Sequence, residues 1–477
     1  MAATGAPAPD PELVEIADYV LDYRIESAEA RTTARDCLRD SLACAFLALD
    51  FEACKRQLGP HVPGTVVPNG ARVPGTDAVL DPVKAARDLG TAIRWLDFND
   101  TWLAAEWGHP SDNLGAILAV ADWRARTGAA AGRPPPTMAD VLDAMIRAHE
   151  IQGGLALENS FNRVGLDHVL LVRVASAAVA TALLGGDRDA VVSALSHAFV
   201  DGGALRAYRQ APNAGPRKSW AAGDAAGRGV QLALLALGGE PPVPEALRAE
   251  GWGFYDVLFG GRRFAFQRPY GSYVMEQVLF KLAHPVEFHA QTAVDAAIDL
   301  HEEVAGRLDA IERIELTTHE AALRIIVKDG PLTNPAARDH CLQYAVAVAL
   351  LRGALRAEDY EDAVAADPRI DALRARMDVR EDPAWSRDYL DPDKRSIANA
   401  VQVFFRDGSA TARRAVEYPL GHRRRREEGR PVLDAKFADA LARRFDAGRC
   451  EEIRALCADA ERLEAMPVHR FVDLLVP

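Results

Sequence analysis

Apolar residues recur at helical spacing through most of the chain. Segments rich in Ala, Leu and Val with a period of about 3.6 dominate residues 11–239, and polar or Gly/Pro-rich connections separate them. The clearest helices are expected over residues 30–49, 141–149, 168–184 and 190–198. Residues 129–137, AAAGRPPPT, form a linker, and Thr137 is expected to cap the helix that follows. The pattern predicts an all-helical N-terminal region.

Strand patterns join the helices after about Tyr270. Residues 311–319, IERIELTTH, alternate apolar and polar side chains, and residues 401–418 hold two strands joined at Asp407 and Gly408. Further helices are expected over residues 290–308, 338–352 and 360–367. The middle of the chain is therefore predicted to be an α+β unit.

Helical spacing resumes over residues 432–475, so the C-terminal segment is expected to pack on the first helices. The predicted fold class is mainly α with an α+β second domain. Residues 1–275, joined by residues 418–477, form a large all-helical domain built from both chain ends. Residues 276–417 form a smaller α+β lid domain inserted between them.

Composition restricts the function classes. The chain has 477 residues, of which 49% are hydrophobic and 26% charged, as in soluble globular proteins. Its net charge of −13 argues against nucleic-acid binding, which needs a basic surface. No apolar run approaches the roughly 20 residues that span a bilayer, and the N-terminus lacks signal-peptide features. No membrane contact and a cytoplasmic location are therefore expected.

The cysteines predict neither disulfides nor a metal centre. Six of them are scattered over helical segments without any CxxC pair: Cys37, Cys44, Cys54, Cys341, Cys450 and Cys457. Buried free thiols are the expected state. Because the ligand spacing of an iron–sulfur cluster or a zinc site is missing, the prediction is a protein that works without a metal or cofactor.

Chemically active side chains gather in DFNDTWLAAEWGHPSDN, residues 97–113. A helix over residues 83–98 is expected to end just before this segment. Ser111 is expected to cap a second helix over residues 112–124. The segment therefore joins two helices, and the free N–H groups of the second helix point into the junction.

This junction is a candidate acid/base and anion-binding corner. It holds Asp97, Thr101 and His109, and clustered polar residues of this kind are rarely needed in a core. The alternative is structural, because Asp97 and Thr101 can cap a helix end and a histidine before a proline is often an ordinary loop residue.

Two later segments repeat a polar loop that runs into an Ala-rich helix. Asp167 is expected to cap a helix starting at His168, whose cationic form the helix dipole disfavours. Ser219 is expected to cap a helix of small residues after the basic loop that holds Arg209 and Lys218. The alternatives are a surface histidine and a solvated basic loop. If the helix starts converge, they form a positive pocket suited to a di- or tricarboxylate.

Several long segments resemble the MmgE/PrpD family. DFNDTW followed by HPSDNLGAILAVADW, together with AHEIQGGLALENSFNRVGLDH, QVLFKLAHPVEFHAQTAVDAA and YPLGHRRRREEGRPVLDAKF, are similar to the branch that dehydrates 2-methylcitrate. The resemblance extends from about Glu15 to the C-terminus. It implies a helical domain with an inserted lid, a homodimer, and a reaction on a small polycarboxylate without a redox cofactor.

The resemblance also implies an active site. The matched positions are Asp97, Thr101, His109, His168, Lys218, Lys281 and Tyr344. We expect His109 and His168 to share the acid and base steps in an order left open, with Asp97 orienting one of them. Lys218 and Lys281 are expected to stabilise the negative charge that develops beside the substrate carboxylate. The substrate-binding positions are expected to be Thr101, Lys281, Tyr344 and Arg209.

The expected reaction removes water from 2-methylcitrate to form 2-methyl-cis-aconitate in propionate breakdown, with citrate as a further substrate. Because the resemblance also covers a cis-aconitate decarboxylase and an epimerase, decarboxylation or isomerisation of a related acid is the alternative. A third hypothesis is a non-enzymatic helical scaffold that binds an acidic partner through the basic run from His422 to Arg426. A solvated turn is the simpler interpretation of that run.

Overall fold

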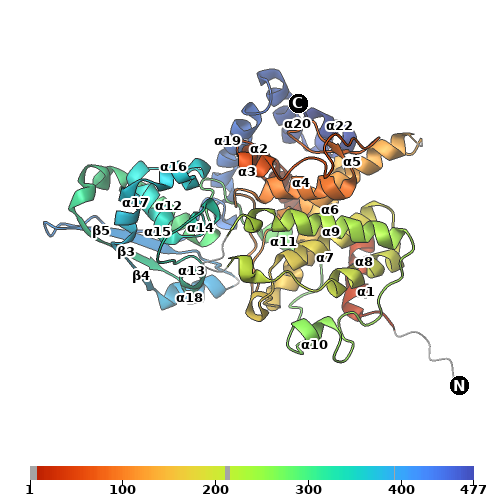
Figure 1. Cartoon of the computed structure of the whole chain (residues 1–477), viewed down its shortest axis with the longest axis horizontal. Coiled ribbons are helices and arrows are strands. Elements are labelled where there is room, and N and C mark those ends of the chain that lie inside the picture. Colours follow the sequence, from red (N-terminus) through yellow and green to blue (C-terminus); the bar gives the residue numbers. More distant parts are fainter. Residues whose placement is uncertain (1–7, 131, 210–214, 392) are drawn as a thin grey trace.

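The chain is built around two hydrophobic cores. The computed structural model describes residues 8–130, 132–209, 215–391 and 393–477. The first core combines side chains between Leu13 and Leu282 with others between Leu433 and Leu475. The second core lies between Val286 and Phe405. Both chain ends therefore form one helical domain, and the middle of the chain forms the smaller lid domain beside it (Figure 1).

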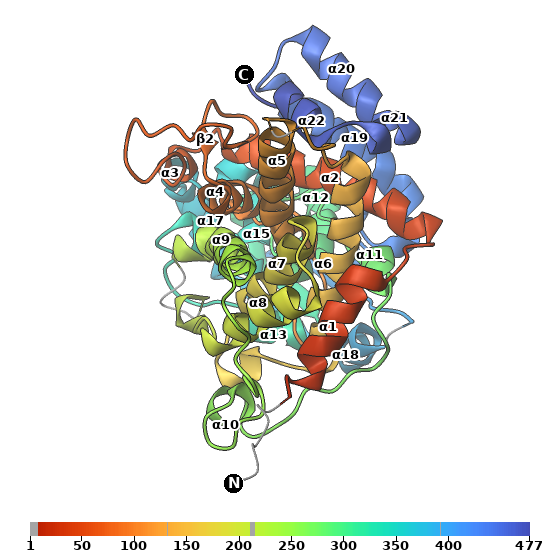
Figure 2. The ribbon, with the colours of Figure 1, turned by 90° about the vertical axis from the view of Figure 1, so that its right-hand side faces the viewer.

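The helical domain is a bundle in which α4, α5, α7 and α9 pack against one another (Figure 2). Its long helices are α1 (Pro11–Asp22), α2 (Ala28–Ala48), α4 (Pro82–Arg94), α5 (Leu114–Ala130), α6 (Met138–Glu158), α7 (Val169–Leu183), α8 (Arg188–Val200) and α9 (Arg217–Leu237). Shorter helices are α3 (Glu52–Lys55), α10 (Phe254–Leu258) and α11 (Tyr273–Gln277), and strands β1 (Ala71–Arg72) and β2 (Val79–Leu80) form a small hairpin. The C-terminal helices are α19 (Arg426–Ala442), α20 (Ala447–Ala458), α21 (Ala460–Ala465) and α22 (Val468–Leu474).

Small residues let α4 and α9 approach closely. A Cβ atom on Gly223 of α9 would lie 2.4 Å from the carbonyl oxygen of Arg87 in α4. This contact holds the C-terminal end of α4 near the first turn of α9. Both helix ends face the lid, so the packing places Arg94 and Lys218 near each other at the domain boundary.

The lid is a four-stranded sheet with helices on its faces. Its strands are β3 (Ile311–Thr318), β4 (Met377–Glu381), β5 (Asn399–Phe405) and β6 (Arg414–Val416), in the order β4-β3-β5-β6. The β3–β4 pair is parallel and the others are antiparallel. The lid helices are α12 (Gln291–Val304), α13 (Glu320–Ile325), α14 (Pro335–Arg338), α15 (Leu342–Arg352), α16 (Asp362–Ala365), α17 (Pro368–Arg374) and α18 (Pro383–Leu390). Helix α12 packs on β5, β6 and α15.

The predicted fold class is confirmed, and several local predictions are too. Thr137 precedes α6, where its N–H donates to the Asp140 carboxylate over 2.7 Å. The predicted strand at residues 311–319 is β3, and the hairpin turn has Gly408 at φ +83°. Strand β4 was not predicted. Along the chain, the first hydrophobic core gives way to the second between Leu282 and Val286, which is somewhat after the expected domain boundary at residues 275–276.

Two predicted helix caps are wrong. Helix α5 begins at Leu114 after a short 3₁₀ turn, and Ser111 lies inside that turn. Helix α9 begins at Arg217, so Ser219 lies within its first turn. The helix expected over residues 83–98 ends at Arg94. Asp97, three residues later, has a φ of +51°, which an α-helix does not allow.

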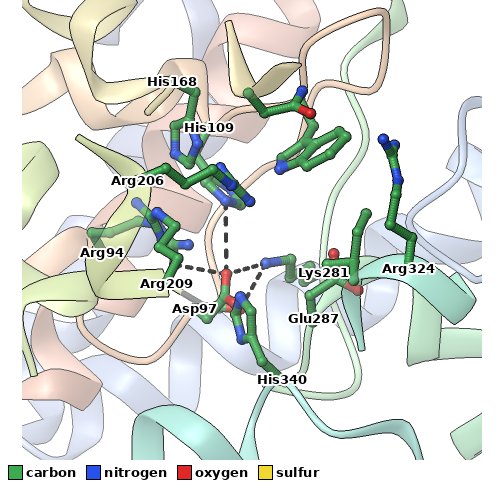
Figure 3. A pocket seen from close by; sticks show the side chains of 13 residues that line it. Arg94, Asp97, His109, His168, Arg206, Arg209, Lys281, Glu287, Arg324 and His340 are labelled. Carbon is green, nitrogen blue, oxygen red and sulfur yellow. Dashed lines mark hydrogen bonds and ion pairs between the residues drawn. The ribbon is translucent and has the colours of Figure 1, made fainter. Parts of the chain in front are cut away.

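The helix expected over residues 338–352 is two helices, α14 and α15, with Asp339, His340 and Cys341 between them. Cys341 has extended backbone angles, which end the helical hydrogen bonding there. Because of this break, His340 lies outside both helices, and its side chain points toward Asp97 of the helical domain (Figure 3).

The basic run is a partly exposed turn, in which Arg424 is exposed and Arg423, Arg425 and Arg426 are half-buried. Arg424 donates to the Asp393 carbonyl over 2.7 Å, and Arg426 donates to the Val278 carbonyl over 2.7 Å. Charged donors on backbone carbonyls of two segments tie the end of the lid to the helical domain. This use of the arginines argues against a scaffold that binds an acidic partner through them.

All six cysteines are free thiols, and all but Cys450 are buried. In the part of the chain that the structure describes, no helix has both the length and the apolar character needed to cross a membrane.

Candidate active site

A cavity of about 140 Å³ lies where the helical domain meets the lid (Figure 3). The helical domain contributes Arg94, Asp97, Trp107, His109, Asn162, His168, Arg206 and Arg209 to its wall, and the connecting segment contributes Lys281. The lid contributes Glu287, Arg324, Ile325 and His340. Cationic side chains thus outnumber carboxylates in the wall, so the cavity suits an anionic molecule although the whole chain is acidic.

Asp97 is the centre of a buried charge cluster. Its Oδ1 atom accepts from Arg94 Nη1 over 2.6 Å and also from Lys281 Nζ, which in addition donates to the Asp97 carbonyl over 2.9 Å. Burial alone raises the pKa of the Asp97 carboxyl, but the charges of Arg94, Lys281 and Lys218 outweigh it and hold the pKa well below its usual range. Asp97 is therefore a carboxylate that fixes the cationic wall.

His109 is held in its neutral form. Its Nδ1 atom is 2.6 Å from the Asp100 carbonyl oxygen, and because a carbonyl only accepts, Nδ1 carries the proton. Burial lowers the pKa of His109, and the charges of Arg94 and Lys281 lower it further, to well below its ordinary value. The neutral ring therefore has an unprotonated Nε2 atom, 3.8 Å from Asp97 Oδ1. That lone pair is available to take a proton.

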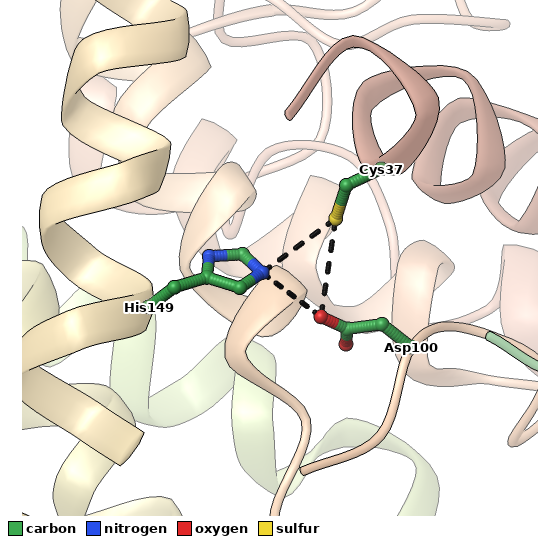
Figure 4. Close-up of side chains that lie close together, drawn as sticks. All are labelled: Cys37, Asp100 and His149. Carbon is green, nitrogen blue, oxygen red and sulfur yellow. Dashed lines mark hydrogen bonds and ion pairs between the residues drawn. The ribbon is translucent and has the colours of Figure 1, made fainter. Parts of the chain in front are cut away.

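A buried hydrogen-bond network behind His109 holds it in place. The Asp100 carboxylate accepts from Ser111 Oγ over 2.6 Å and from the Ser111 N–H over 3.1 Å. His149 Nε2 lies 2.9 Å from Asp100 Oδ2, and Cys37 Sγ donates to the same oxygen over 3.8 Å (Figure 4). Burial raises the pKa of the Cys37 thiol well above its ordinary value, so the thiol keeps its proton. One residue, Asp100, thus anchors the turn after His109 and orients its ring.

His149 is held at both ring nitrogens. Its Nδ1 atom lies 2.8 Å from the Met145 carbonyl oxygen and donates to it. Its Nε2 atom lies 2.9 Å from Asp100 Oδ2, which is hydrogen-bond distance. These buried contacts make the orientation of Asp100 stiff.

His168 faces the same cavity with both ring nitrogens free of hydrogen-bond partners among the described residues. Its ring centroid lies 5.6 Å from that of His109. Burial lowers the pKa of His168 well below its ordinary value, while the Asp167 carboxylate, 3.5 Å from Nδ1, opposes the shift. Asp167 also accepts from Arg209 Nη2 over 3.2 Å, which holds that guanidinium in the wall. Both histidines are therefore neutral near pH 7.

The lid closes the cavity through a second charge cluster. Lys218 Nζ donates to the Asp339 carboxylate over 2.6 Å, and it lies 2.9 Å from His340 Nδ1 and 3.7 Å from Asp97 Oδ2. Burial lowers the pKa of Lys218 to about 8, against the effect of Asp339. Burial and the Lys218 charge lower the pKa of His340 to about 4. The cluster joins α9 of the helical domain to the α14–α15 break of the lid.

Most of the residues expected from the sequence lie at or directly behind the cavity. Asp97, His109, His168, Arg209 and Lys281 line it. Thr101 and Lys218 lie behind the wall: Thr101 Oγ1 is 3.4 Å from His109 Nδ1, and Lys218 is fully engaged in the lid contact. Tyr344 is turned away, since its hydroxyl donates to the Asp359 carbonyl over 2.6 Å within the lid core.

Other wall residues were not identified from the sequence. They are Arg94, Trp107, Arg206, Glu287, Arg324, Ile325 and His340. Arg94 lies inside a helix expected to be structural, and His340 inside a helix expected to be continuous. Asn162 also lines the cavity, and the buried Glu106 carboxylate holds it by accepting from its side chain over 2.7 Å. The unusual density of arginines around residues 206–209 is the signal that was available.

Two models of one protein family match the chain, one on each side of the change from the first hydrophobic core to the second. The MmgE/PrpD N-terminal domain model matches residues 14–267, and the MmgE/PrpD C-terminal domain model matches residues 284–461. The chain belongs to the MmgE/PrpD family. It is 62% identical over 471 residues to 2-methylcitrate dehydratase of Cupriavidus necator, which covers 98% of this chain and 97% of the relative.

Relatives from other organisms match over nearly the same length. The chain is 60% identical over 470 residues to 2-methylcitrate dehydratase of Salmonella typhimurium, covering 98% of this chain and 97% of that protein. It is 56% identical over 481 residues to mitochondrial 2-methylcitrate dehydratase of Yarrowia lipolytica, covering 100% of this chain and 92% of that protein. The similarity therefore includes both domains and the cavity between them.

Proposed function

We propose that the protein is a 2-methylcitrate dehydratase, a hydro-lyase that removes water from 2-methylcitrate to form 2-methyl-cis-aconitate. Similarity of about 60% over the full length to relatives of that name is the observation that carries the proposal. The cavity supports it independently. Its cationic wall fits a tricarboxylate, and the neutral His109 beside it fits removal of a proton next to a carboxylate.

In the proposed mechanism His109 is the base. Its Nε2 atom takes the proton from the carbon next to a carboxylate, and Arg94 and Lys281 stabilise the negative charge that develops there. The C–H bond and the C–OH bond of the neighbouring carbon break, a C=C bond forms, and the hydroxyl leaves as water. The departing hydroxyl takes up one proton to become water, which balances the proton that His109 removes.

His168 is the proposed acid. Three substrate carboxylates in the cavity raise the pKa of this buried ring, because opposite charge favours the imidazolium form. Asp167 at 3.5 Å from Nδ1 favours the same form. The protonated ring then gives its proton to the departing hydroxyl, and transfer from His109 to solvent or to His168 restores the starting state.

The remaining predictions from the sequence stay predictions. A homodimer, a cytoplasmic location, a role in propionate breakdown and activity without a metal are part of this proposal. The mitochondrial relative from Yarrowia lipolytica makes location a separate question from activity.

Product analysis tests the function. Purified protein should convert 2-methylcitrate to a conjugated product that absorbs near the ultraviolet edge, and should convert citrate more slowly. Activity should survive treatment with a chelator. Release of carbon dioxide from cis-aconitate, with no change in 2-methylcitrate, would instead establish the alternative decarboxylase.

A further inference from the structure

The cavity wall is polar except at one place. Among the described residues that line it, only Trp107 and Ile325 have apolar side chains, and each is half-buried. They come from different domains: Trp107 from the loop before His109, and Ile325 from the last turn of α13 in the lid. Both pack on one small apolar cluster that also spans the two domains: Leu103, Leu279, Phe288, Ala321, Tyr389 and Ile397.

Trp107 is held in a defined position beside the proposed base. Gly108, between Trp107 and His109, pairs with Trp102 through two backbone hydrogen bonds of 2.8 and 3.0 Å. The guanidinium of Arg206 lies 5.2 Å from the Trp107 ring centroid, and that of Arg324 lies 5.5 Å from it. The indole is therefore fixed between a cation of the helical domain and a cation of the lid.

A dehydratase for 2-methylcitrate has a corresponding apolar group to recognise. The substrate differs from citrate by one methyl group, which in the product 2-methyl-cis-aconitate stands on a carbon of the new double bond. That carbon is the one that loses the proton, so the methyl group must lie beside the base. The carboxylates of the substrate bind to the cationic wall. The methyl group, in contrast, is stabilised only by contact with an apolar side chain.

We propose that Trp107 and Ile325 form the methyl-recognition site and set the preference of the enzyme for 2-methylcitrate over citrate. This inference rests on the proposed function. The two side chains touch the substrate methyl group from opposite sides when the lid is closed. Because one of them belongs to the lid, the methyl contact exists only in the closed state, where proton transfer takes place.

The ratio of kcat/KM for 2-methylcitrate to kcat/KM for citrate tests the proposal. Ile325→Ala should lower this ratio roughly tenfold or more, the usual value of one methyl contact in an apolar pocket, and Ile325→Val should lower it less. Trp107→Phe should lower it as well. General damage to the site changes both specificity constants together and leaves the ratio unchanged.

A gain of function makes the test independent of folding. The space opened by Ile325→Ala should increase the kcat/KM of a 2-ethyl homologue relative to that of 2-methylcitrate. Ile326→Val is the matched control, because Ile326 is buried in the lid core one residue further on and does not line the cavity. Its ratios should equal those of the unmodified protein.

The outcomes separate this proposal from the proposed function. Turnover of 2-methylcitrate by the unmodified protein, with equal losses for both acids in Ile325→Ala and Trp107→Phe, would overturn the methyl site and leave the function intact. Turnover of neither acid by the unmodified protein would overturn both.

Discussion

The two walls of the cavity are built differently. On the helical-domain side, His109 is oriented by Asp100, which is itself held by Ser111 and His149 at buried hydrogen-bond distances. On the lid side, Arg324 is exposed, and its guanidinium lies 5.5 Å from the centroid of the Trp107 ring of the opposite wall. The group proposed as the base thus lies on a stiff wall, and the lid supplies contacts that depend on closure.

This difference indicates a division of work. Proton transfer needs geometry that is set before the substrate arrives, and a buried network of short hydrogen bonds provides it. Selection and exclusion of water need a part that can open, and a few ion pairs across a domain boundary allow this. Changes to the first wall should therefore reduce kcat, and changes to the second should affect KM, specificity and motion.

The largest effect is expected for His109→Gln. Loss of a positioned base should lower kcat roughly 10²- to 10⁴-fold, measured by product absorbance. In the parent, the acid limb of kcat/KM that reports His109 should lie below about pH 6.5, because the pKa of His109 is lowered and the base stays neutral above that value. The variant should lack this acid limb. His197→Gln, on the outer helix α8, is the control and should leave the rate unchanged. Near-normal rates in His109→Gln would remove this residue from the chemistry.

The stiffness of the helical wall is tested at Asp100. Asp100→Ala should lower kcat roughly 10- to 100-fold with little change in KM, since residues that orient a reactive group usually have effects of this size. Asp100→Asn should recover most of the rate, because the amide can accept from Ser111 and donate to a neutral His149. If Asp100→Asn loses as much as Asp100→Ala, the charge of Asp100, and not its hydrogen bonding, is what matters.

A smaller effect on turnover is expected at the lid contact. Lys218→Met leaves the Asp339 carboxylate buried without its cation, so the closed state should become less populated and KM should rise several-fold. Hydrogen exchange should be faster at the α14–α15 break, and saturating substrate should slow it. Lys394→Met, which removes an exposed ion pair with Asp388, is the control for loss of a lid lysine. Equal exchange in Lys218→Met and the parent would show that Lys218 does not hold the lid.

The smallest effect on turnover is expected for a change that alters stability alone. His319 is buried in the lid, where its ring stacks on Tyr389 with centroids 4.8 Å apart, and burial lowers its pKa to about 3. The folded ring stays neutral while the unfolded one takes a proton below about pH 6.5, so its contribution is present above that pH and is lost as the pH falls toward 3. The loss is about 1.4 kcal/mol per pH unit.

His319→Phe should therefore make lid stability less dependent on pH between about 6.5 and 3, as measured by thermal unfolding at several pH values. The same replacement at the exposed His61 is the control. An identical pH dependence in parent and His319→Phe would mean that the ring is protonated in the folded lid.

Local sequence patterns predict many of the helices and strands of this protein. The alternation at Ile311–Thr318 predicted β3, and the Ala-rich spacing predicted the helix that is α7. These features depend on neighbours within a few positions, so the sequence carries them directly. The motifs that hold His109 and His168 were also visible, because polar clusters interrupt long apolar segments there.

The surroundings of these side chains depend on residues far apart in the chain. His340 lines the cavity at a break in the helix predicted over residues 338–352. Arg94 contacts Asp97 there, where Asp97 turns the chain at a positive φ after the end of α4. Neither event has a local signal strong enough to predict it.

The sequence by itself determined the helical and α+β parts, their order, and the loops that carry the two histidines. Only the tertiary structure decided that His109 is neutral with a free Nε2 atom and that Lys218 contacts the lid and does not line the cavity. The physical reason is that helices and strands follow from short-range spacing. Protonation and access, in contrast, follow from charges and burial that long-range packing brings together.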